Sequence, residues 1–168
     1  MITKLMRKSL LATLLALGGL SGNGVVQAAV IADYPDFTSA CGSSALTCVG
    51  DAATVGSVLR VAPAASGQSG AAYSTTSVTL GSNATFSTTF QFQFTNPGGI
   101  DPADGITFVL AQSSNGLGGA GGGIGYQGVP NSVAIEVDTY DNGSDDANSS
   151  NAVGVDVERQ SRVAREPV

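Results

Sequence analysis

Residues 133–146 read VAIEVDTYDNGSDD, an alternating run that predicts a β-strand followed by an acidic loop. Side chains alternate across a strand, so the Val and Ile positions are predicted on one face and Glu136, Asp138 and Tyr140 on the other. We expect the apolar face to pack in a core and the acidic face to form a site. Carboxylates about 7 Å apart on one face repel unless a proton or a cation lies between them. The strand therefore indicates acid/base chemistry or metal binding.

Other segments predict further strands and almost no helix, because Gly, Ser, Thr and Asn interrupt each stretch before a 3.6-residue apolar period can build. Residues 84–94 place phenylalanines on one face, which predicts one half-buried antiparallel strand. Residues 105–111 are apolar on both faces and predict a strand in the middle of a sheet that is covered on both sides. Residues 152–158 alternate valine with Gly, Asp and Glu. Several short strands predict an all-β fold, an antiparallel β-sandwich.

The 168 residues divide into three predicted parts. Residues 1–28 combine a basic start, an apolar stretch too short to span a membrane and the small-residue sequence VQA, which predict a secretory signal peptide. Residues 29–158 have the size of one domain. Residues 159–168 contain three arginines and form an atypical tail. We expect a protein that is secreted, periplasmic or on the cell surface, with no membrane insertion after signal cleavage.

The net charge of the chain after signal cleavage limits the classes of partner that it can bind. Four Arg face thirteen Asp and Glu after cleavage, which gives a net charge of −9 and argues against binding to nucleic acid or anionic membranes. This acidity can serve solubility alone, but seven of the acids lie between residues 101 and 146, which favours a cation site. The chain has no His, which excludes Ser-His-Asp and Cys-His catalysis.

Cys41 and Cys48 are the only cysteines. An exported chain meets an oxidising compartment, where so close a pair can form a disulfide. We expect a structural bond, because a redox site would need a C-x-x-C pair in a thioredoxin-like setting.

The acidic loop that follows residue 138 does not fit the EF-hand pattern, because Ser149 stands where a bidentate Glu is required. It still offers the hard oxygens that calcium prefers. The donors expected from the residues are Asp138, the carbonyl of Tyr140, Asn142, and Asp145 or Asp146.

The segment 116–128 contains GLGGAG, a formal match to the dinucleotide-binding fingerprint. That fingerprint requires a helix to follow, and the Gly and Pro residues here cannot start one. We expect either a flexible loop or a loop whose bare backbone approaches a ligand closely.

Four segments in order resemble the legume-type lectin family in its bacterial form: DPADGITFVLA, a glycine-rich stretch, NSVAIEVDTYDN and VGVD. The resemblance covers about residues 33–156. It implies a concanavalin-like jelly roll, apparently truncated, because family domains continue beyond VGVD with several more strands. It also implies a non-catalytic protein that binds glycans, with calcium and often Mn²⁺ or a similar transition metal beneath the sugar pocket.

The resemblance further implies roles for single residues. Sugar contacts are implied for Asp104, Gly122, Tyr140 and Asn142, with Gly121 or Gly123 as alternatives to Gly122 and a cis bond between Ala103 and Asp104. Metal ligands are implied at six positions: Glu136, Asp138, Tyr140, Asn142, Asp145 and Asp146. Only one of the last two would be a ligand. Asn151 and Ala152 stand where the family usually has a histidine, which argues against the transition metal more than against calcium.

Two other functions stay open at this stage. The segment EVDTYD resembles the E-x-D-x-x-E strand of laminarinase-type glycoside hydrolases, in which Glu136 would be the nucleophile and Asp141 the acid/base. Asp141 is shorter than the usual Glu, however, and the chain has no Trp to stack on a glucan. The other alternative is a surface or matrix protein that binds no sugar, or an inactive fragment. The motifs do not identify the sugar.

Overall fold

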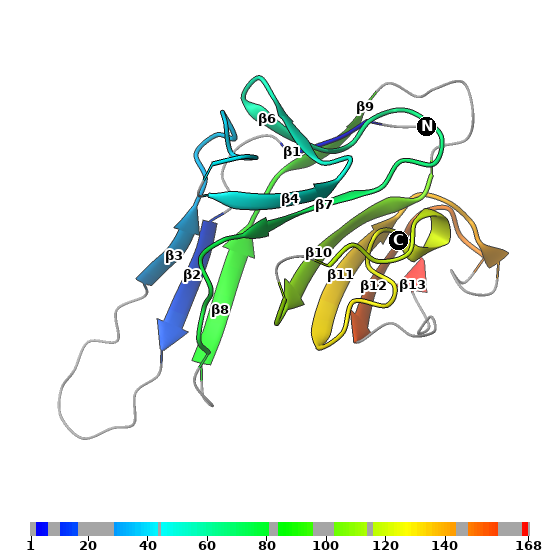
Figure 1. Ribbon diagram of the computed structural model, residues 1–168. Helices are drawn as coiled ribbons and strands as arrows, with labels where there is room; N and C mark the ends of the chain where they lie inside the picture. The colour runs from blue at the N-terminus through cyan, green and yellow to red at the C-terminus, as the bar shows by residue number, and fades with distance from the viewer. Residues whose placement is uncertain are drawn as a thin grey trace.

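The computed structural model describes residues 3–6, 11–16, 29–43, 45–80, 84–95, 103–113, 116–143, 148–157 and 166–167. Within them the chain forms antiparallel β-sheets and one short 3-10 helix, η1 (Gly121–Gly123) (Figure 1). The predicted all-β, antiparallel fold is confirmed. None of the helical structure in these residues is long and apolar enough to cross a membrane.

One sheet carries most of the predicted site. Its strand order is β10 (Gly105–Ala111), β11 (Ser132–Asp138), β12 (Ala152–Val157) and β13 (Glu166–Pro167). Gly105 pairs with Asp138 at one end of β10 and β11, and Ala111 pairs with Ser132 at the other. Asp138 in turn pairs with Ala152 of β12. The start of β10 and the end of β11 therefore lie side by side.

The other described strands form three smaller sheets. One has the order β5 (Ala53–Val55), β6 (Val58–Ala62), β1 (Thr3–Met6) and β9 (Phe92–Thr95). A second has the order β3 (Ala29–Asp33), β2 (Leu11–Ala16) and β8 (Ala84–Thr89), and β4 (Leu46–Gly50) pairs with β7 (Gly70–Ser74). Strands β1 and β2 belong to the predicted signal peptide. Its removal stays a prediction.

Two apolar clusters form the core. The first lies around Phe37, Leu46 and Leu59, and a disulfide between Cys41 and Cys48 packs against it. The two cysteine Cα atoms lie 5.5 Å apart, and the bond is the one that their spacing suggested. The second cluster consists of Tyr126, Val129 and Ala134 and joins the glycine-rich segment to β11.

Residues share the two faces of β11 as predicted, but their burial is the reverse of the expectation, because the acidic face is buried and the apolar face only partly so. The buried residues share the acidic face: Ser132, Ala134, Glu136 and Asp138. Ile135, expected in the core, is 47% exposed. The glycine-rich segment explains the reversal, because its Tyr126 packs onto Ala134 and covers the acidic face. Alternation gave the correct period, but it could not show which face a distant loop would cover.

Strand β12 has the same orientation as β11. Its Ala152, Gly154 and Asp156 are buried, whereas its three valines are between 41% and 65% exposed. The valine side chains lie on the same face as Ile135, since Ile135 pairs with Val155.

Two further expectations about strands need correction. Strand β10 stands at the edge of its sheet among the described strands, and not in the middle, although both of its faces are partly covered. The phenylalanine-rich stretch forms two strands, β8 and β9, with a break at residues 90–91. Phe90 at this break stacks on Phe108 of β10, with ring centroids 5.4 Å apart. The break thus directs one aromatic ring toward the neighbouring sheet.

Candidate functional site

Three carboxylates lie on the covered face of the β10–β13 sheet. Glu136 and Asp138 on β11 and Asp156 on β12 are all 0% exposed. Asp156 pairs with Ala134, and Glu136 pairs with Gly154, so Asp156 and Glu136 are diagonal neighbours on one face. The sequence interpretation did not include Asp156 in the site. The sequence did carry a signal for Asp156, because the alternation in β12 matches that in β11.

Such burial has an electrostatic consequence. A buried carboxylate is stabilised by hydrogen-bond donors, by protonation or by a nearby cation. Residues 29–158 contain one basic side chain, that of Arg60, and Arg60 lies on β6 in a different sheet. Basic side chains of this domain therefore contribute little to balancing the acidic face, and a bound metal ion is a suitable source of positive charge.

The end of β11 is held against the start of β10. The backbone N–H of Thr139 donates to the carbonyl oxygen of Asp104 at 2.8 Å, and the N–H of Tyr140 donates to Oδ1 of Asp138 at 2.9 Å. The Ala103–Asp104 peptide bond is cis, the form that the resemblance implied. These contacts bring Asp104, expected to touch sugar, next to Asp138, expected to bind metal.

Gly105 makes this close approach possible. Its φ is +158°, and a Cβ atom at this position would lie 2.4 Å from the carbonyl oxygen of Val137. No real Cβ contact is so short, so any side chain here would push β10 and β11 apart. The glycine after Asp104 therefore fixes where the Asp104 carboxylate stands relative to Asp138.

The loop after β11 extends into solvent. Tyr140 is 39% exposed and Asn142 is also exposed. The side chain of Asp141 accepts a hydrogen bond from the N–H of Gly143 at 2.7 Å and so shapes the turn. This exposure leaves the Tyr140 ring and the Asn142 amide accessible to a ligand.

The glycine-rich segment is an ordered turn over the acidic face. The Tyr126 ring is fully buried, and its hydroxyl donates to the carbonyl oxygen of Asp156 at 3.3 Å. Thr107 of β10 donates through Oγ1 to the carbonyl oxygen of Ile124 at 3.4 Å. Sequence reasoning missed Tyr126, and the one available signal was a lone aromatic residue among glycines. Backbone hydrogen bonds hold the turn, such as that from the N–H of Gly118 to the carbonyl oxygen of Gly125 at 2.8 Å. A close approach of its backbone to a ligand stays a prediction.

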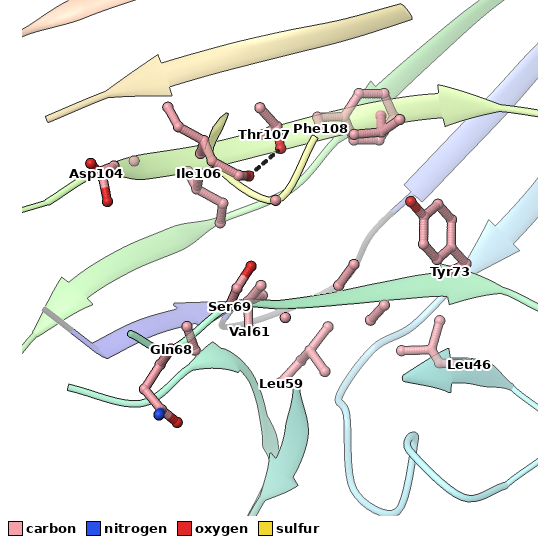
Figure 2. A pocket seen from close by; sticks show the side chains of 18 of the residues that line it. Leu46, Leu59, Val61, Gln68, Ser69, Tyr73, Asp104, Ile106, Thr107 and Phe108 are labelled. Carbon is pink, nitrogen blue, oxygen red and sulfur yellow. Dashed lines mark hydrogen bonds between the residues drawn. The ribbon is translucent and has the colours of Figure 1, made fainter. Parts of the chain in front are cut away.

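A cavity brings two of the expected sugar-binding regions to one place. Asp104 and Gly121 both line it, and Figure 2 shows Asp104 at one end, next to the start of β10. Gly122 follows Gly121 in η1. Asp104 and Gly121 thus border the same cavity, and the expected backbone donor Gly122 is the residue next to Gly121.

The expected ligands suit calcium better than a transition metal. Within the described ranges, no three His, Cys, Asp or Glu side chains converge in a way that could hold a metal. Asp145 and Asp146, two of the expected ligands, lie outside the described residues. The donors that remain are carboxylate, carbonyl and amide oxygens, which suit Ca²⁺. A transition metal fits poorly, because the chain has no imidazole.

Comparisons with known proteins agree with this geometry. The family model of the legume lectin domain matches residues 32–168. The chain is similar to favin of Vicia faba, with 37% identity over 84 residues, 46% of this chain and 36% of favin. It is also similar to bark lectin of Styphnolobium japonicum, with 37% identity over 81 residues, 44% of this chain and 29% of that lectin. The chain therefore spans about a third of the length of these curated relatives.

Proposed function

The chain belongs to the legume lectin family, and from this premise we propose that it is an exported, calcium-dependent carbohydrate-binding protein without catalytic activity. One observation carries the proposal furthest. The hydrogen bond from Thr139 to Asp104 joins the expected sugar contact to the strand of expected metal ligands. A metal ion at the end of β11 would therefore act directly on the position of Asp104.

In the proposed site, each sugar contact has its own chemistry. The Asp104 carboxylate accepts hydrogen bonds from sugar hydroxyls, and the Gly122 N–H donates one. The Asn142 amide can do both, because it carries an acceptor oxygen and donor N–H groups. The exposed Tyr140 ring offers an apolar surface to the C–H face of a sugar. A site of this kind recognises hydroxyl groups and breaks no bond.

Calcium would be held by the oxygen donors around the end of β11. We assign them as Glu136, Asp138, the Tyr140 carbonyl, Asn142 and one of Asp145 and Asp146. The ion would supply positive charge to the buried acidic face and would favour one conformation of the loop. We propose calcium alone, because the missing imidazole removes the strongest ligand for a transition metal.

A hydrolase mechanism has less support. A retaining glycosidase needs two carboxyl groups about 5–5.5 Å apart that both reach the scissile bond. Glu136 is fully buried on β11, whereas Asp141 is exposed and accepts a hydrogen bond from Gly143. The two carboxyl groups thus stand in different surroundings, one enclosed beneath the glycine-rich segment and one in solvent.

A glycan array probed with and without calcium tests sugar binding. We expect one or a few related glycans to bind the protein in the presence of calcium. These binding signals should disappear when calcium is removed. Asp104→Ala should lose these signals, because the sugar hydroxyls lose their acceptor. Asp33→Ala, which removes an exposed carboxylate on β3, is the matched control and should keep them. An empty array in calcium, with the protein folded, would favour a surface or matrix protein that binds no sugar.

Export is a separate part of the proposal. We expect cleavage after Ala28, so that the exported protein begins at Ala29 and lacks β1 and β2. Intact-mass measurement of protein collected from the periplasm or the medium checks this. A mature protein that retains residues 1–28 would contradict it and would leave both strands in their sheets.

A further inference from the structure

The two strands of the predicted signal peptide lie at internal positions in their sheets. Strand β1 pairs with β6 on one side and with β9 on the other, and both pairings are antiparallel. Strand β2 lies between β3 and β8 in the same way (Figure 1). Cleavage after Ala28 would therefore remove an inner strand from two sheets. It would leave two openings, each one strand wide, which we name the β6/β9 slot and the β3/β8 slot.

The edges of these slots carry backbone groups that need partners. Among the described strands, β3 and β8 pair only with β2, and β9 pairs only with β1. Each of these three strands would lose its ladder, whereas β6 would keep its pairing with β5. A row of unpaired N–H and C=O groups along a strand is a template for another strand. Because a slot offers two such edges, one added strand would complete two ladders.

The segment that fills the β3/β8 slot shows what kind of chain fits there. Strand β2 contributes six residues, LATLLA, and they stand in register with the whole of β8. The segment contains no Pro and no charged residue. Pro is excluded from a strand that is paired on both sides, because it cannot donate to either ladder. The slot therefore suits an extended apolar segment of polypeptide.

The β6/β9 slot adds a preference for charge. Arg60 on β6 stands opposite Leu5 of β1 on one side and opposite Ala53 of β5 on the other. Within the described part of the chain, its buried Nε atom has no hydrogen-bond partner. Neither leucine nor alanine has a side-chain acceptor to offer. A carboxylate in the place of Leu5 could accept this N–H in a charge-assisted hydrogen bond. The strand that fits best therefore carries Asp or Glu opposite Arg60.

We propose that the exported protein binds extended strands of a partner polypeptide in these two slots, with an acidic residue of the partner opposite Arg60. Main-chain hydrogen bonds to both edges would supply affinity, and the pocket-facing side chains of the added strand would supply specificity. The inference rests on the proposed cleavage after Ala28. In the uncleaved chain, β1 and β2 fill the slots and exclude the partner.

Peptides of residues 1–8 test the preference of the β6/β9 slot. The Leu5→Glu peptide should bind the exported protein at least fivefold more tightly than the natural sequence, and Arg60→Met in the protein should abolish this gain. The Met6→Glu peptide has the same charge but places it opposite Leu59, so it should gain nothing. If circular dichroism shows that Arg60→Met does not fold, the two peptides are compared on the unaltered protein. Equal affinity of the Leu5→Glu and Met6→Glu peptides would refute the pairing with Arg60.

A fluorescent peptide of residues 9–18, with two added lysines at each end for solubility, tests the β3/β8 slot. Fluorescence anisotropy should show saturable binding to exported protein whose intact mass begins at Ala29. The full chain that retains residues 1–28 should bind at least tenfold more weakly, because β2 fills its slot. The Thr13→Pro peptide should not bind, because it lacks a backbone N–H in the middle of the strand.

Three outcomes would overturn the proposal in distinguishable ways. Equal binding of the peptide to the cleaved and the full chain would indicate non-specific association with apolar surface, as would equal binding of the two peptides. Cleaved protein that binds neither peptide would refute the slots and leave the proposed export intact. Exported protein that retains residues 1–28 would refute the cleavage and the slots together.

Discussion

Single residues decide how the glycine-rich segment folds over the acidic face. A Cβ atom at Gly118 would lie 2.4 Å from the carbonyl carbon of Tyr126 and 2.6 Å from the oxygen of Gln127. The close approach allows the N–H of Gly118 to donate to the carbonyl of Gly125 at 2.8 Å. At Gly116, by contrast, a Cβ atom would make only an ordinary contact with Val129 at 3.5 Å. The backbone around Gly118 therefore leaves no room for a side chain, whereas the surroundings of Gly116 can accept a methyl group.

Gly118→Ala should lower the free energy of unfolding by about 1–3 kcal/mol, because the added methyl group forces backbone apart. Gly116→Ala should change it by less than about 0.5 kcal/mol. Urea denaturation of both variants measures the difference. Equal stability of the two would show that the segment does not pack as described.

Tyr73 gives the molecule a specific response to alkali. Burial raises the pKa of its hydroxyl above the ordinary 10.0, so the folded protein holds this proton more tightly than the unfolded chain. The stabilisation is complete below about pH 10 and is lost as the pH rises through the folded pKa. Above pH 10, the Tm of the wild type should fall more steeply than that of Tyr73→Phe. Parallel Tm curves for the two proteins would contradict the raised pKa of the half-buried Tyr73 hydroxyl.

At the scale of strands, two isoleucines on one face of the sheet differ in their surroundings. Ile106 on β10 pairs with Val137, and Ile135 on β11 pairs with Phe108, so both isoleucines point to the same side. Ile106 is 5% exposed beneath the neighbouring layer, whereas Ile135 is 47% exposed. The same apolar face is therefore covered at β10 and open from β11 onward.

Ile106→Lys should destabilise the protein by several kcal/mol or prevent folding, because it buries an unpaired charge. Ile135→Lys should cost no more than about 1 kcal/mol, since its ammonium group can reach water. Thermal unfolding followed by circular dichroism compares the two variants. Failure of Ile135→Lys to fold would restore the sequence prediction that this face is core.

These strands show what a sequence pattern can and cannot predict. Period-two alternation predicted β11 and β12 closely, because it is a local property of the chain. Which face is buried depends on a covering segment elsewhere in the sequence, and here Tyr126 packs onto Ala134 of the acidic face. Glu136 and Asp138 are fully buried, although the sequence predicted the core on the opposite, apolar face. The break between β8 and β9 could not be predicted from the sequence either, because the stacking of Phe90 on Phe108 is a tertiary contact.

For the whole molecule, motif order and spacing were more informative than periodicity. They predicted the family, and with it the β-sandwich and the cis bond between Ala103 and Asp104. They gave no role to Tyr126 or Asp156, which reach the acidic face only through the fold. The expected ligands Asp145 and Asp146 lie outside the described residues, so their roles stay predictions.

The central claim is that calcium at the end of β11 positions Asp104 for sugar. Isothermal titration with a glycan identified on the array tests it most directly, in calcium, in excess chelator, and after calcium is restored. Chelation should weaken affinity at least a hundredfold, and added calcium should restore it. Undiminished affinity in excess chelator would contradict the account.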